Sequence, residues 1–329
     1  MTVPTLLNLN DIRVFSGSSN LALASEIARL LGVPLEPTAI TRFTNDNLYV
    51  QLGSTVRGRN VYLIQSLTPP VNDHLMELFM MLDIARSASA KQVHAVIPYF
   101  SFARSDKKDA PRISITARLV ADLLQTAGAT NVMTMMLHSP QVHGFFSVPT
   151  DPLTSRPVFQ EYFSRQKLDD TIVIAPDIGS AKSAARFAKD LGGLPVAAGN
   201  KERVSDTQVH VGGLIGAQLR GMKRALIYDD EIATGGSMLE IVRILVEAGV
   251  TEIQLVCTHG LFTGSALERL GAMPEITGIV TTDTIYQPPS KRHPKLHIVS
   301  VAHVFADAIR KNYLGESISD LFVYGQGNN

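Results

Sequence analysis

The chain has 329 residues, with 30 basic and 30 acidic side chains and a single cysteine. The zero formal charge argues against a nucleic-acid surface and against electrostatic attachment to membranes. The single Cys257 excludes an intramolecular disulfide and indicates a reducing compartment. Residues 1–15 contain charges and no sustained apolar run, and no later run suits a membrane span, so we expect a soluble cytoplasmic protein.

Segments typical of strands and of helices alternate along nearly the whole chain. Their expected order is strand 60–65, helix 71–87, strand 93–98, helix 114–127, strand 131–137, strand 171–175 and helix 180–191. This alternation predicts an α/β fold with mostly parallel sheets flanked by helices. Residues 149–157 contain three prolines and mark the expected junction, so we predict one domain at 1–150 and a second at 151–329.

The most specific motif lies at residues 225–237. Residues 225–228 predict a short buried strand that ends at Asp229 and Asp230, and helical spacing of apolar residues begins at Met238. The connection between them consists of Ala233, Thr234, Gly235, Gly236 and Ser237. Unpaired amides of a first helical turn, glycines and a serine hydroxyl together suit a phosphate monoester. The two carboxylates suit a divalent cation or sugar hydroxyls, and an ordinary capped turn is the alternative.

The chain also contains an internal similarity. A shift of about 121 positions superposes residues 124–132 on 245–253 and His138 on His259. The same shift lays residues 113–116 over 234–237, so the first half would have the same helix entry without paired glycines. We expect a duplicated α/β unit with one sugar-phosphate site per chain, against the alternative that two amphipathic helix-strand segments are similar by chance.

Strings along almost the full length resemble the ribose-phosphate diphosphokinases, which are also called phosphoribosyl diphosphate synthetases. The matching strings are residues 42–47, 65–77, 97–108, 137–146, 175–179, 201–203 and 225–237. The resemblance implies two similar phosphoribosyltransferase-type domains that arose by internal duplication, an N-terminal ATP-side domain and a C-terminal ribose-phosphate-binding domain. It also implies transfer of the diphosphoryl group of ATP to the anomeric hydroxyl of ribose 5-phosphate, which gives 5-phosphoribosyl 1-diphosphate and AMP.

On the sugar side, the resemblance implies that residues 233–237 bind the 5-phosphate while Asp229 and Asp230 hold the sugar hydroxyls and Mg²⁺. Lys201 and Arg203 match the family's catalytic loop. Residues 199–212 are polar and lack regular periodicity, as is expected of a lid that closes over substrate. Such cations would neutralise charge that develops during phosphoryl transfer.

On the ATP side, the resemblance assigns nucleotide binding to Phe43, Asn45, Asn47, Arg104, Asp106 and His138. It assigns metal binding to His138, Asp177, Asp229 and Asp230, with Mg²⁺ as the cofactor. In the family, the segment around Phe43 completes the ATP site of a neighbouring subunit. We therefore expect a homo-oligomer that is built from dimers, with a hexamer among the expected sizes, and small-molecule substrates rather than nucleic acid or membranes as partners.

Several positions depart from the common family pattern. Asn45 and Asn47 stand where acids are usual, Met136 replaces the acid that commonly precedes Leu-His, and Ser105 stands where glutamine is frequent. Met136, Asn45 and Asn47 motivate one alternative, a non-catalytic regulatory homologue. A diphosphokinase for a larger 5-substituted ribose such as ADP-ribose is a further alternative. A nucleobase phosphoribosyltransferase would share the sugar loop but would not bind ATP.

Overall fold

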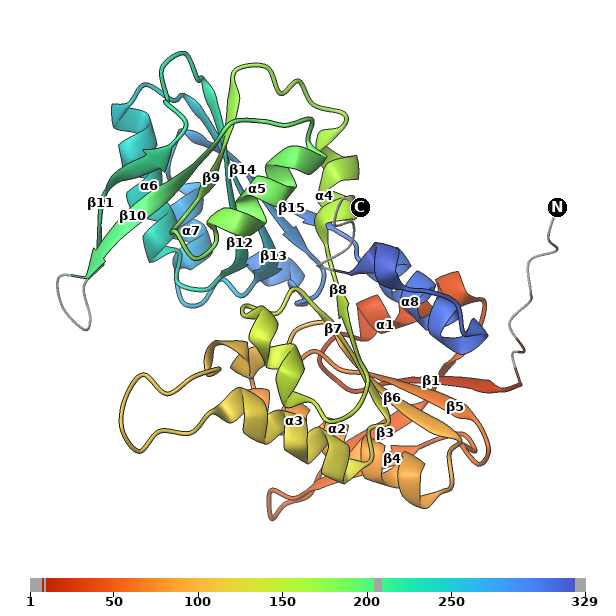
Figure 1. Cartoon of the computed structure of the whole chain (residues 1–329). Coiled ribbons are helices and arrows are strands. Elements are labelled where there is room, and N and C mark those ends of the chain that lie inside the picture. Colours follow the sequence, from red (N-terminus) through yellow and green to blue (C-terminus); the bar gives the residue numbers. More distant parts are fainter. Residues whose placement is uncertain (1–7, 9, 204–208, 323–329) are drawn as a thin grey trace, which may run out of the picture. The chain divides into compact units, whose positions relative to one another are not determined.

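The computed structural model describes residue 8, residues 10–203 and residues 209–322 (Figure 1). For residues 201–203 and 209–212 it describes the backbone only. The chain forms two compact units. The first unit comprises the described residues up to Thr154, Thr284–Tyr286 and the described residues from Ser300 onward. The second unit comprises Ser155–Asp283 and Gln287–Val299. None of the helices in the described ranges is long and apolar enough to cross a membrane.

The first unit contains a parallel sheet of six strands in the order β2-β1-β5-β6-β7-β8 and a separate antiparallel hairpin, β3-β4. Its elements are β1 (Ile12–Ser16), α1 (Leu21–Leu31), β2 (Leu35–Glu36), β3 (Thr38–Arg42), β4 (Leu48–Leu52), β5 (Asn60–Ile64), α2 (Val71–Ser87), β6 (Gln92–Ile97), the 3-10 helix η1 (Ser101–Arg104), α3 (Thr116–Ala127), β7 (Asn131–Met135), η2 (Pro140–Phe145), β8 (Thr150–Leu153), α8 (Ala302–Leu314) and η4 (Ser319–Leu321).

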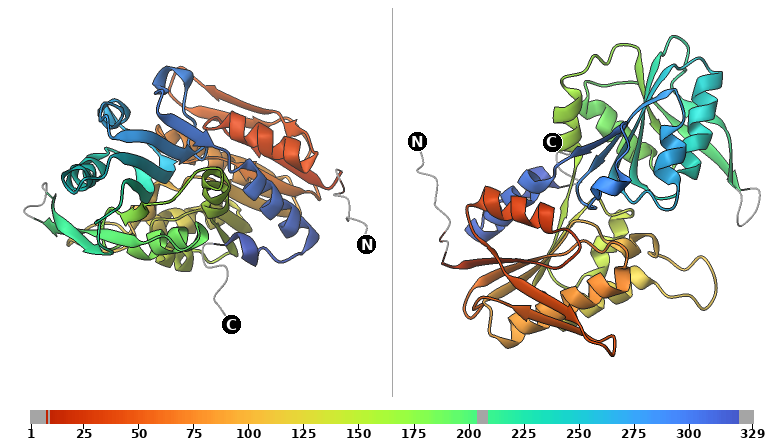
Figure 2. Two further views of the ribbon diagram at one scale, coloured as in Figure 1. Left: turned by 90° about the horizontal axis from the view of Figure 1, so that it is seen from above. Right: turned by 180° about the vertical axis from the view of Figure 1, so that it is seen from behind.

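The two faces of this sheet are covered by different helices. Val61 and Leu63 of β5 join the core formed with α2 and α3. Tyr62 points the other way, and its hydroxyl donates to the side-chain oxygen of Asn312 in α8 at 3.0 Å. Helix α8 lies beside α1 (Figures 1 and 2). Because side chains alternate along a strand, one strand can serve both cores.

The second unit contains a seven-stranded sheet in the order β11-β10-β9-β12-β13-β14-β15. Its elements are α4 (Arg156–Phe163), β9 (Thr171–Ala175), α5 (Ala181–Asp190), β10 (Val196–Arg203), β11 (Val209–Gly216), β12 (Arg224–Ile232), α6 (Gly236–Glu247), β13 (Glu252–Gly260), α7 (Ala266–Gly271), β14 (Ile276–Thr282), η3 (Pro289–Lys291) and β15 (Leu296–Val299). Helices α6 and α7 cover one face and α4 and α5 the other. The predicted α/β class with parallel sheets flanked by helices is confirmed.

The order of strands corrects the register of the internal similarity. With β11 set aside, the order β10-β9-β12-β13-β14-β15 repeats β2-β1-β5-β6-β7-β8 in the same chain order. The counterpart of β12 and α6 is therefore β5 and α2, whereas the sequence shift paired α6 with α3. The first unit's equivalent of the phosphate loop is accordingly residues 65–70, which contain Pro69 and Pro70 and no glycine, rather than residues 113–116.

The compact units also differ from the expected sequence ranges at the C-terminus. We expected residues 151–329 to form one domain, but the described residues from Ser300 onward belong with the first unit. The physical reason is that α8 lies against α1 and buries Phe305 and Ile309 completely. The proline-containing junction near residue 150 indicates where the chain passes from the first unit to the second. The amphipathic pattern of the sequence does not indicate where the chain later returns to the first unit.

Candidate active site

Asp229 and Asp230 lie within β12 rather than beyond its end. The parallel register with β13 places Asp229 opposite Cys257 and Glu231 opposite His259, and the pairing continues to Ile232. The predicted strand at 225–228 was therefore too short. Backbone hydrogen bonds continue through the acidic residues because the ladder does not depend on apolar side chains.

The surroundings of Asp229 disfavour the charged form of its carboxyl group. The amide of Asp230 donates to Oδ1 of Asp229 at 2.9 Å. The pKa of Asp229 is raised well above its ordinary value, first by burial, then by the negative charge of Asp230, with a smaller effect of Asp177. A cation or a proton is the natural counterpart of such a group.

Asp177 lies in the turn after β9, the strand next to β12. Its Oδ1 accepts from the amide of Ser180 at 3.0 Å and from the Ser180 hydroxyl at 3.1 Å, just before α5 begins. The carboxyl ends of β9 and β12 therefore gather three acids at one edge of the sheet. Even so, no three His, Cys, Asp or Glu side chains have the geometry of a metal site among the described residues.

The loop that follows β12 leads directly into the first turn of a helix. Gly235 has φ 74°, and α6 begins at Gly236. A first helical turn leaves its amides without intrahelical partners. Within the described part of the chain, the amides of Gly235, Gly236 and Ser237 make no hydrogen bond to another residue. These donors and the Ser237 side chain surround the start of a helix, as the sequence predicted.

The backbone of Lys201 and Arg203 lies in a strand, just after a register shift between Gly199 and Lys201. β10 pairs antiparallel with β11, with Lys201 opposite Val211 and Arg203 opposite Val209. The sequence of residues 199–212 shows no regular periodicity, yet the described residues of this range lie in two paired strands at one edge of the sheet. The alternation of Val209 and Val211 is the strand signal that the polar composition obscured. The side chains of Lys201 and Arg203 lie outside the described part, so their catalytic roles stay predictions.

In the first unit, Phe43, Asn45 and Asn47 lie at the tip of the β3-β4 hairpin. The amide of Phe43 donates to the Asn47 carbonyl at 2.9 Å, and the amide of Asn47 donates to the Asn45 side-chain oxygen at 3.3 Å. The Phe43 side chain is 52% exposed and its ring lies 5.8 Å from that of Tyr49. The tip thus offers an aromatic surface on a hydrogen-bonded turn.

Arg104 and Asp106 follow β6, at the end of η1 and just beyond it. Arg104 is exposed and Asp106 is partly buried. Between them, the Ser105 hydroxyl accepts from the amide of Thr116 at 3.1 Å, at the start of α3. Ser105 therefore caps the start of α3. Its short side chain has a structural function at a position where the family that the sequence resembles frequently has glutamine.

His138 follows β7 and is exposed. Met136, two residues earlier, is 6% exposed, and its sulfur accepts from the Thr154 hydroxyl at 3.5 Å. An apolar residue at this position is therefore packed inside the first unit. His138 belongs to the first unit and Asp177 to the second, so their joint metal site stays a prediction.

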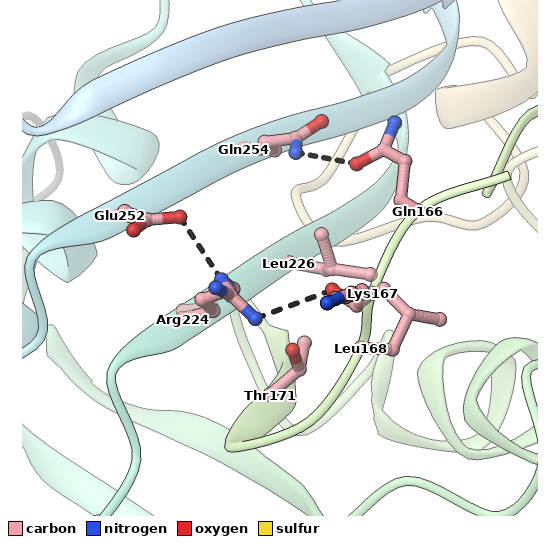
Figure 3. Close-up of a pocket in the computed structure, with 9 residues that line it drawn as sticks. Gln166, Lys167, Leu168, Thr171, Arg224, Leu226, Glu252 and Gln254 are labelled. Carbon is pink, nitrogen blue, oxygen red and sulfur yellow. Dashed lines mark hydrogen bonds and ion pairs between the residues drawn. The ribbon is translucent and has the colours of Figure 1, made fainter.

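A cavity of about 210 Å³ lies elsewhere in the second unit, at the amino ends of β9, β12 and β13. Arg224 begins β12 and pairs with Glu252 at 3.0 Å, while the side-chain amide of Gln254 donates to Gln166 at 2.9 Å (Figure 3). Four of the polar side chains that line this cavity therefore form two pairs with each other. The acids lie in the carboxyl half of β12, so the cavity is separate from the candidate site.

One residue of the candidate site was missed by the sequence reasoning. Arg269 in α7 donates from Nη2 to the carbonyl oxygen of Thr234, at 2.6 Å. The two residues are 35 positions apart in the chain, and an exposed arginine in a short helix carries no local signal of such a contact. Only the tertiary structure brings it to the loop.

Comparisons with known proteins agree along nearly the whole chain. Residues 12–128 match the N-terminal domain of ribose phosphate pyrophosphokinase, and residues 213–323 match the phosphoribosyl synthetase-associated domain. A putative ribose-phosphate pyrophosphokinase of Streptomyces coelicolor is 49% identical over 95% of this chain and 98% of that protein. A ribose-phosphate pyrophosphokinase of Deinococcus radiodurans is 47% identical over the same shares. The crystal structure of phosphoribosylpyrophosphate synthetase from Mycobacterium smegmatis is similar with a TM-score of 0.85 and 32% identity, over 93% of this chain and 99% of that one.

Proposed function

The chain belongs to the ribose-phosphate pyrophosphokinase family, and on that premise we propose that it transfers the β,γ-diphosphoryl group of ATP to the anomeric hydroxyl of ribose 5-phosphate. The products are 5-phosphoribosyl 1-diphosphate and AMP. The proposal rests on one observation: Asp229 and Asp230 of β12 lie just before a loop whose backbone amides at residues 235–237 make no hydrogen bond to other described residues. That arrangement suits a sugar phosphate whose hydroxyls and phosphate lie a few atoms apart.

On the sugar side, residues 233–237 bind the 5-phosphate through backbone amides and the Ser237 hydroxyl. Asp229 and Asp230 accept hydrogen bonds from the sugar hydroxyls and fix the anomeric oxygen for attack on the β-phosphorus. Positioning of this kind accounts for much of the rate enhancement in phosphoryl transfer, because the protein takes part in little covalent chemistry.

On the nucleotide side, Arg104 grips the phosphates, and Asp106 and His138 complete the ATP contacts. Phe43 stacks on adenine while Asn45 and Asn47 hydrogen-bond its edge. Lys201 and Arg203 neutralise the charge that develops on the transferred group and on the AMP leaving group. The exposure of Phe43 on a hairpin tip supports an ATP site that a neighbouring subunit completes, in a homo-oligomer built from dimers.

Mg²⁺ is the proposed cofactor. A divalent cation supplies charge neutralisation to the phosphates, and Mg²⁺ is usually held by one or two carboxylates together with substrate phosphates and water. The partly buried Asp229, beside Asp230 and with Asp177 nearby, fits that donor set. The buried single Cys257 supports a reducing, cytoplasmic location.

The test is an assay of the purified chain with ATP, Mg²⁺ and ribose 5-phosphate, with AMP and the sugar 1-diphosphate followed by phosphorus NMR. We expect equal amounts of both products, and loss of both in Asp230→Asn. ADP-ribose as the competing acceptor distinguishes the larger-acceptor alternative. Absence of AMP across pH and Mg²⁺ concentration would reject the proposal in favour of a regulatory homologue.

A further inference from the structure

Three consecutive carbonyl groups, of Ile232 at the end of β12 and of Ala233 and Thr234 in the loop at 233–237, accept hydrogen bonds from residues that follow β13. The amides of Leu261 and Phe262 donate to the carbonyl of Ile232 at 3.0 and 3.1 Å, and the amide of Thr263 donates to that of Ala233 at 3.0 Å. The carbonyl of Thr234 accepts from Arg269 instead, at 2.6 Å. The first two carbonyls are therefore held by backbone, and the third is held by a side chain.

Occupied carbonyls matter because of the geometry of the peptide group. In a planar trans peptide, the C=O and the following N–H point in opposite directions. A donor that fixes the Thr234 carbonyl therefore also fixes the direction of the Gly235 amide. It further keeps a partial negative charge turned away from the side where a phosphate would bind.

The conformation of Gly235 makes this peptide group the sensitive one in the loop. Its φ of 74° is a backbone conformation that residues with a side chain rarely adopt. The glycine lies beside Leu270, the residue after Arg269. Without a donor on the Thr234 carbonyl, a glycine imposes little restraint on the rotation of the peptide. Helix α7 therefore contributes both the packing and the hydrogen bond that set the loop.

We propose that Arg269 is a positioning residue for ribose 5-phosphate: its guanidinium holds the Thr234 carbonyl so that the Gly235 amide faces the 5-phosphate. The inference rests on the proposed function of this loop. It concerns one substrate only, because the contact lies in the loop assigned to the sugar phosphate. Loss of the arginine should weaken sugar phosphate binding and leave ATP use unchanged.

The test compares Arg269→Ala and Arg269→Lys with Arg165→Ala. Arg165 is a matched control, since it is also an exposed arginine of the second unit, and it pairs with Glu161 at 3.4 Å. A hydrogen bond from a charged donor corresponds to about a tenfold effect. We expect the KM for ribose 5-phosphate to rise about tenfold in Arg269→Ala, with the KM for ATP and the Tm equal to those of the control. Arg269→Lys should recover part of the loss, because an ammonium group can donate to the same carbonyl.

Calorimetric titration with ribose 5-phosphate and Mg²⁺ gives a readout that needs no turnover. A wild-type chain that binds the sugar phosphate but forms no AMP would reject the proposed function and still report on Arg269. Equal sugar phosphate affinity in Arg269→Ala and in wild type would overturn the inference. A loss shared equally by ATP and sugar phosphate, with a lower Tm than in Arg165→Ala, would overturn it too, since that is the signature of general destabilisation.

Discussion

Replacing Gly235 by alanine tests the conformation of the sugar-phosphate loop directly. At φ 74°, an alanine pays about 1–2 kcal/mol for the left-handed backbone. Its Cβ would lie 3.1 Å from Cδ1 of Leu270, so the leucine must shift, at a further cost of about 1 kcal/mol. Alanine also restricts the unfolded chain, which offsets about 0.4–1 kcal/mol. We expect a net loss of about 1–2.6 kcal/mol.

Gly236→Ala is the matched control one residue later. Its φ is not positive, and the nearest atom to a new Cβ is the Thr234 hydroxyl at 3.9 Å. Because Gly236 is the first residue of α6, alanine there should be neutral or stabilise the helix by up to about 1 kcal/mol. The two substitutions are chemically identical and should change stability in opposite directions.

Thermal unfolding and steady-state kinetics check this pair. For a domain of this size, the Tm of Gly235→Ala should fall by about 2–10 °C, and its KM for ribose 5-phosphate should rise because the loop amides are displaced. The Tm of Gly236→Ala should not fall. If both variants have the wild-type Tm, the left-handed conformation and the contact with Leu270 do not have the energetic role inferred from the structure.

Three further outcomes are expected. Because the pKa of Asp229 is raised, a cation that binds there displaces a proton, and Mg²⁺ affinity should increase with pH. Calorimetry in buffers of different ionisation enthalpy should detect this proton release. Asp229→Asn should abolish it. Burial lowers the pKa of His94 from 6.5 to about 4, so the unfolded chain binds a proton that the folded chain does not. Stability should therefore fall by about 3 kcal/mol as pH drops from 6.5 towards 4, and urea titrations at pH 7.5 and 5 should show a smaller pH effect in His94→Phe, which keeps a ring against Tyr62. Lys201→Ala should lower kcat by about 100-fold or more and change the KM for ribose 5-phosphate little, because the lysine acts on developing charge; an unchanged kcat would contradict that role.

The sequence predicted the elements whose burial is reflected in their composition. β5 and β9 are buried along their whole length and read as near-continuous apolar runs, and α2 was predicted at the bounds that it has. The carboxyl half of β12 was not predicted because acids replace the apolar run there. Residues that serve a site are chosen for chemistry rather than for strand propensity, so the pattern fails at the functional edge.

The internal similarity was placed in the wrong register for a local reason. Gly128 and Gly249 both follow a helix with positive φ, 126° and 91°, and each is followed by a strand. A helix that ends at a glycine and leads into a buried strand constrains several neighbouring residues at once. The match between residues 124–132 and 245–253 therefore reflects shared helix-end geometry, and the equivalence of the two sheets became clear only from strand order.

The candidate site was predictable where its residues are neighbours in the chain. Asp229, Asp230 and the loop after them form one continuous string with a recognisable chemistry. Arg269 reaches the same loop from a separate helix, and the sequence offers no rule that selects it from the other arginines. The polar composition of residues 199–212 likewise concealed the strands that the described residues of this range form, since strands at the edge of a sheet tolerate polar side chains.

The return of α8 to the first unit affects the order in which the protein can form. The chain passes from one unit to the other after Thr154, after Asp283, after Tyr286 and after Val299. During synthesis, the first unit therefore lacks the helix that covers α1 and Tyr62 until nearly the whole chain has emerged. A fragment that ends near residue 150 would expose the side chains of α1 and β5 that α8 covers. We therefore do not expect such a fragment to fold on its own.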